Sequence, residues 1–96
     1  MTTLTLLSAD APALRPFVEN ALARELRLLE LAVRRTEEHV RSFEAAYQLP
    51  TDEFLRRYAN DEFTETLDLD EWIGEARLLV RLQEKLRIAK GIRFAD

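Results

Sequence analysis

The most regular pattern in the chain is a series of positions, nearly all apolar, that are spaced alternately four and three residues apart. The series consists of Leu22, Leu26, Leu29, Val33, Thr36, Val40, Phe43 and Tyr47. Only Thr36 interrupts its apolar character, and no glycine or proline occurs between Pro16 and Pro50. This spacing places all of these side chains along one face of an α-helix. We therefore predict a long helix over residues 13–48, roughly 50 Å in length.

Three further residues widen this apolar seam in the middle of the predicted helix: Leu28, Leu31 and Ala32. Two antiparallel helices bury only one stripe each, so a wider stripe leaves apolar surface without a partner in a single chain. We therefore expect a homodimer in which two hairpins form a four-helix arrangement. The seven apolar seam residues listed above are the expected core and dimer contacts.

Two shorter segments follow the long helix. Pro50 ends that helix, because the residue before a proline is driven out of the α region. Thr51 is expected to cap a short helix over residues 51–59, whose apolar face consists of Phe54, Leu55 and Tyr58. Residues 60–67 are then expected to form a connecting loop.

A third helix is predicted over residues 69–90. Asp68 and Glu71 resemble a capping box at its start, and Gly91 is a natural end for it. Gly74, inside this helix, costs about 1 kcal/mol relative to alanine. The predicted apolar stripe consists of Trp72, Ile73, Ala76, Leu79, Val80, Leu82 and Leu86.

These elements predict one all-α domain over residues 1–96: a long antiparallel helical hairpin with a short helix closing its turn. Residues 1–12 are expected to be a short strand or a frayed extension. The chain is 47% hydrophobic and 33% charged, which suits packed amphipathic helices and excludes a disordered acidic tail. No apolar run reaches the roughly 20 residues of a membrane span, and no basic segment precedes the apolar residues near the N-terminus. We expect a cytoplasmic protein that does not enter a membrane.

Nothing in the composition indicates catalysis or cofactor binding. The chain has no cysteine and a single histidine, His39, so a zinc site would need mostly carboxylates. The acidic segment after Asn60 lacks the central glycine of a calcium-binding EF-hand loop. Neither Ser8 nor Ser42 lies in a nucleophile elbow, and no glycine-rich phosphate loop is present. We predict no catalytic residues, no metal, no cofactor and no enzymatic activity.

The charge is unevenly distributed along the chain, although the net charge of −4 argues against bulk nucleic-acid binding. Between Asp61 and Glu71 there are six acidic residues and no basic one. Between Arg77 and Arg93 there are six basic residues and one acidic residue, Glu84. The helix dipole favours acids at a helix start and bases towards its end, which explains this order structurally.

The aromatic residues are concentrated in the second half of the chain, where Phe54, Tyr58, Phe63 and Trp72 lie close together in sequence. They are expected either to form a hydrophobic plug at the turn of the hairpin or to remain exposed as anchors for a partner. Together with the basic face of the third helix, they form the set of candidate partner contacts: Phe54, Tyr58, Phe63, Trp72, Arg77, Arg81 and Lys85.

The segment from Phe43 to Tyr58 and the motif Asp70-Glu71-Trp72-Ile73-Gly74-Glu75 resemble a family of small uncharacterised bacterial and archaeal helical proteins. That family commonly has glycine where Gln48 stands and methionine where Leu49 stands. The resemblance implies an antitoxin-like protein that binds a small toxin-like protein encoded nearby, with no catalytic residues.

Three functions follow as hypotheses. The first is a protein-binding module, antitoxin-like, that covers its partner with helix surface. The second is a DNA-binding autorepressor that uses the basic third helix. The third is a purely structural coiled-coil protein.

Overall fold

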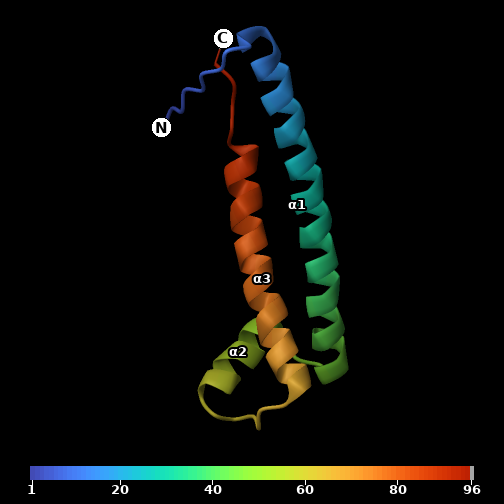
Figure 1. The fold of residues 1–96 in the computed structure, drawn as a ribbon. Helices are drawn as coiled ribbons and strands as arrows, with labels where there is room; N and C mark the ends of the chain where they lie inside the picture. Colours follow the sequence, from blue (N-terminus) through green and yellow to red (C-terminus); the bar gives the residue numbers. More distant parts are fainter. Residues whose placement is uncertain (96) are drawn as a thin grey trace.

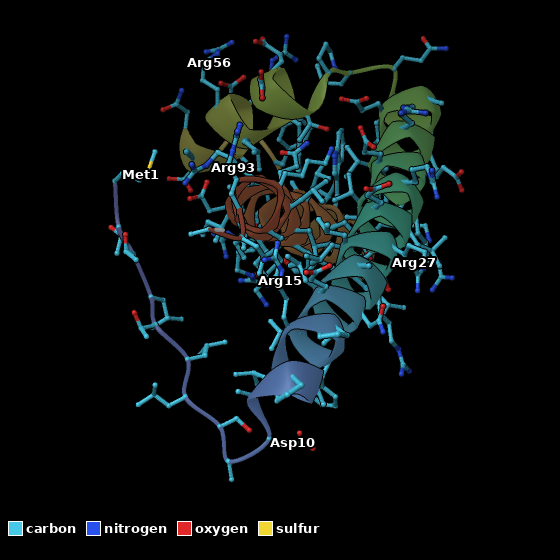
Figure 2. All side chains as sticks on the ribbon, turned by 90° about the horizontal axis from the view of Figure 1, so that it is seen from above. Met1, Asp10, Arg15, Arg27, Arg56 and Arg93 are labelled. Atoms are coloured by element: carbon cyan, nitrogen blue, oxygen red, sulfur yellow. The ribbon has the colours of Figure 1, made fainter. Side chains whose placement is uncertain are left out.

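The computed structural model describes residues 1–95, and all regular secondary structure in this range is α-helical. It contains α1 (Ala11–Tyr47), α2 (Thr51–Ala59) and α3 (Leu67–Lys90). α1 and α3 run antiparallel as two sides of a long hairpin, and α2 lies beside α3 at the closed end (Figure 1). The predicted order of a long, a short and a second long helix is confirmed. Residues 1–10 form neither helix nor strand and extend away from the helices (Figure 2).

The start of α3 differs from the prediction. The helix begins at Leu67, and its cap is Thr66, whose hydroxyl oxygen accepts a hydrogen bond from the Leu69 N–H at 3.2 Å. Because a threonine hydroxyl in an extended residue reaches this N–H readily, Thr66 takes the role that we had assigned to Asp68. Asp68 and Asp70 instead lie in the first turn, where their negative charges interact favourably with the positive end of the helix dipole.

The corner between α1 and α2 is held by Glu44. Gln48 adopts a left-handed conformation with φ 49°, and the Leu49 N–H donates to the Glu44 carbonyl at 3.1 Å. Pro50, not Thr51, occupies the capping position of α2 and offers no side-chain acceptor. The Glu44 carboxylate supplies this acceptor from α1, because its Oε2 accepts from the Thr51 N–H at 2.7 Å.

An aromatic core fills the closed end of the hairpin. Phe54 and Trp72 are both wholly buried, and their rings stack with centroids 3.9 Å apart. From α1, Phe43 and Tyr47 stack on Trp72 at centroid separations of 5.9 and 5.6 Å. The expected hydrophobic plug is therefore present, and it joins all three helices.

The predicted seam of α1 packs along α3 of the same chain. Leu29, Thr36 and Val40 are buried, and Leu22, Leu26, Val33 and Phe43 are partly buried. Tyr47, at the end of the seam, is 42% exposed although its ring stacks on Trp72. The buried residues of α3 are Leu69, Trp72, Ala76 and Ala89.

The molecule is elongated because α2 covers only one end of the hairpin. Its radius of gyration is 19.1 Å and its extents are 58 × 24 × 18 Å. A compact chain of this length has a radius of gyration of about 12–13 Å. Towards the open end, where α1 begins and α3 ends (Figure 1), the fold consists of two helices alone.

Candidate partner-binding groove

An open groove runs between α2 and α3, with a volume of about 660 Å³. It is lined by Leu55, Tyr58 and Ala59 from α2, and by Ile73, Ala76, Arg77, Val80 and Arg81 from α3. The floor is apolar, and the two arginines are the charged residues of the lining. We call this feature the α2–α3 groove.

The helical period explains how both helices contribute to the groove. Tyr58 and Ala59 follow Leu55 by three and four residues, so all three share one face of α2. Ile73 and Val80 are seven residues apart and share one face of α3 by the same rule. Ile73 also packs against the aromatic core, which anchors the floor, whereas Val80 is 67% exposed where α2 no longer covers α3.

The basic side of the groove carries unpaired charge. Within residues 1–95, Arg77 and Arg81 have no ion-pair partner, unlike Arg56 and Arg57, which pair with Glu53. An exposed guanidinium without an intramolecular partner is available to bind a carboxylate through two parallel hydrogen bonds.

Tyr58 contributes a hydroxyl group to the groove lining. Burial raises the pKa of Tyr58, and the nearby charges of Glu65, Asp70 and Asp61 raise it further. The phenol, whose ordinary pKa of 10.0 already keeps it protonated at neutral pH, presents a hydrogen-bond donor beside the apolar floor.

The structure divides the predicted partner contacts into three groups. Tyr58, Arg77 and Arg81 come together in the groove, and Lys85 is exposed farther along α3. Phe63 is partly buried and meets Phe54 edge-on at a centroid separation of 5.5 Å. The remaining two candidates were wrongly placed, because Phe54 and Trp72 are 0% exposed and cannot contact a partner in this fold.

Sequence reasoning missed five groove residues as contacts: Leu55, Ala59, Ile73, Ala76 and Val80. Val80 had been assigned to the stripe that faces the long helix, but it lies about 100° around α3 from Leu79 and is exposed. An apolar residue on that separate face was the signal in the sequence from which a contact surface could have been predicted.

Other chemistry in the described residues is sparse. His39 has a half-exposed side chain, and its Nδ1 lies 3.4 Å from Glu75 Oε2 across the α1–α3 seam. Within residues 1–95, no group of three or more acidic or histidine side chains is placed to hold a metal ion. No helix in this range is long and apolar enough to cross a membrane.

Comparison with known proteins adds no assignment. No family model matches the chain, and no curated protein or solved structure is significantly similar to it.

Proposed function

We propose that the protein is a non-enzymatic, protein-binding module that receives an amphipathic helix of a partner in the α2–α3 groove. The observation that carries this proposal is the apolar groove beside two arginines that have no ion-pair partner within residues 1–95. An apolar floor with a charged rim suits a helix that presents an apolar stripe flanked by acidic residues.

Binding would bury Val80, an exposed apolar residue of the groove, and the ring of Tyr58. Aromatic and arginine side chains at the centre of an interface supply much of its binding energy. Arg77 and Arg81 would fix the orientation of the partner helix through its carboxylates.

The resemblance in sequence gives the partner a class: a small toxin-like protein encoded nearby, which this chain neutralises by covering its surface.

The protein is further proposed to act as a homodimer. Its accessible surface is 7824 Å², against about 5,700 Å² for a compact monomer of 11.2 kDa. The excess surface supports association.

Co-expression with the product of the neighbouring gene tests the groove. The tagged wild-type chain should retain that product through purification. Val80→Glu should weaken capture at least about tenfold, because it removes an apolar contact and the partner would have to desolvate a carboxylate in the apolar floor. Gln83→Glu adds the same charge at an exposed position outside the groove lining and should retain the product. Equal capture by both variants, or none by the wild type, would exclude the proposal.

A DNA-binding autorepressor remains the alternative hypothesis, since Arg77, Arg81 and Lys85 are exposed on α3. It predicts that the protein retards its own upstream DNA in a gel, with an affinity that falls steeply as salt is raised. The protein-binding proposal predicts no such shift in the absence of the partner.

A further inference from the structure

A second apolar face lies on the N-terminal half of α1, separate from the seam that packs on α3. Phe17, Leu28 and Leu31 are 73%, 51% and 46% exposed. With Ala21 and Arg24 they form a row spaced by four, three, four and three residues, which is a second heptad row on the same helix. We call this row the outer face of α1.

The outer face contains a preformed hollow of about 390 Å³. Its lining residues are Phe17, Asn20, Ala21, Arg24, Glu25 and Leu28. They form two overlapping sets with the spacing i, i+3, i+4 and i+7, starting at Phe17 and at Ala21. In packed helix pairs, four residues with this spacing form the hole that receives one side chain of the facing helix. The hollow therefore has the form of a socket for a second helix.

We propose that the outer face of α1 is the interface between two copies of this chain, packed antiparallel about a two-fold axis near Arg24 and Glu25. With the axis in this position, each residue of one copy faces a residue of the second copy, and the two residue numbers add up to 49. Leu28 then lies over Ala21 of the second copy, and Arg24 lies opposite Glu25 of the second copy, with both pairs repeated by symmetry.

Self-complementarity is what selects a second copy as the occupant. The face presents a large side chain and a small one at positions that the two-fold axis exchanges, Leu28 and Ala21. It also presents adjacent opposite charges at the axis, so that two reciprocal ion pairs form where like charges would otherwise meet. The same pairing brings Phe17 against Ala32 of the second copy, extending the contact along α1.

This interface leaves the groove open. The outer face lies towards the open end of the hairpin, whereas α2 lies at the closed end (Figure 1). The inference rests on the homodimer proposed above and is independent of partner binding in the groove. It also accounts for part of the surface that exceeds a compact monomer, since packing the two α1 helices together would cover apolar residues on both.

Light scattering coupled to size exclusion tests the face. The wild-type protein should have twice the 11.2 kDa mass of one chain. Leu28→Glu should raise the dissociation constant of the dimer at least about tenfold, because it places a charge in the socket. Ala23→Glu adds the same charge at an exposed position of α1 outside the lining and should remain dimeric. Circular dichroism checks that both variants are folded.

Disulfide cross-linking tests the orientation, and the chain has no cysteine of its own. Oxidised Arg24→Cys should form a covalent dimer, because this position lies near the axis in both copies. Oxidised Leu31→Cys should not, because an antiparallel pairing separates the two copies of that position along the helices.

Each contrary result has a distinct meaning. A monomeric wild type overturns both the interface and the homodimer. A dimer that persists with Leu28→Glu overturns the interface alone. Cross-linking at both cysteine positions overturns the antiparallel arrangement, and none of these results bears on capture through the groove.

Discussion

At the scale of single residues, Thr51 connects all three helices through its hydroxyl group. The hydroxyl donates to Glu44 Oε2 at 2.8 Å and accepts from the Trp72 indole N–H at 3.0 Å. Trp72 is wholly buried, so its N–H has no access to bulk water. A buried donor without an acceptor loses hydration without compensation, which makes Thr51 important out of proportion to its size.

Replacing Thr51 with valine should therefore destabilise the fold. Thr51→Val keeps the branched shape but leaves the Trp72 N–H unpaired, and it should lower the free energy of unfolding by about 1–3 kcal/mol. Thr51→Ser keeps the hydroxyl and should cost less. Urea unfolding followed by the fluorescence of Trp72, the single tryptophan, measures both. Equal losses for the two variants would contradict the role of this hydrogen bond.

The two tyrosines should ionise at unusually high pH. Desolvation raises the pKa of Tyr47 above its ordinary value of 10.0, and its hydrogen bond to Asp68 at 3.2 Å raises it further. Desolvation and nearby carboxylates raise the pKa of Tyr58 in the same direction. The resulting stabilisation is fully present below pH 10.0 and is lost as pH rises through the folded-state pKa values. Phenolate absorbance should show both midpoints above 10.0, and a midpoint at or below that value would refute the account.

Gln48 is a position where glycine should improve stability. Its φ of 49° lies in the left-handed region, which costs a side chain about 1–2 kcal/mol and costs glycine little. Part of the gain is offset by the greater freedom of glycine in the unfolded chain, so Gln48→Gly should raise the free energy of unfolding by about 0.5–1 kcal/mol. Asp61→Gly should gain less, since aspartate tolerates the same region better. Thermal unfolding of both variants tests this order.

At the scale of elements, the hairpin depends on the seam between α1 and α3. Leu29 is 7% exposed in that seam, so Leu29→Ala should cost about 2–5 kcal/mol through lost contacts and the cavity left behind. Val80→Ala removes an exposed side chain from α3 and should cost less than about 0.5 kcal/mol. Chemical denaturation separates the two cases. Wild-type stability in the Leu29 variant would mean that the seam is not the core of the hairpin.

The helices were predictable because their signals are local. The spacing of the seam, the break at Pro50 and the stop at Gly91 depend on residues close in sequence, and they placed the elements within a few positions. The caps were less predictable. Glu44 caps α2 from a different helix, and the choice of Thr66 over Asp68 depends on the backbone conformation adopted by the loop.

At the scale of the whole molecule, packing is uneven from one end to the other. The closed end has three helices around Phe54 and Trp72, whereas the open end has two helices with half-buried leucines such as Leu22 and Leu86. At the open end, the guanidinium of Arg15 in α1 lies 5.6 Å from the centre of the ring of Phe94, which follows α3. The surfaces proposed for association follow from this arrangement, because one short helix cannot cover the full length of α3.

The groove could not be predicted from the sequence in the same way as the helices. Its residues lie on two helices, and whether Tyr58 and Val80 share a surface depends on how α2 docks on α3. The aromatic cluster was correctly located near the turn, but sequence did not separate its two buried members, Phe54 and Trp72, from the partly exposed Tyr58. That distinction arises only from packing.

Partner binding in the α2–α3 groove is tested most directly by amide hydrogen exchange of the protein alone and in complex with the product of the neighbouring gene. We expect the partner to slow exchange in α2 and in the Ile73–Arg81 part of α3, which together line the groove. Protection confined to α1, or no change in exchange on adding that product, would contradict partner binding in the groove.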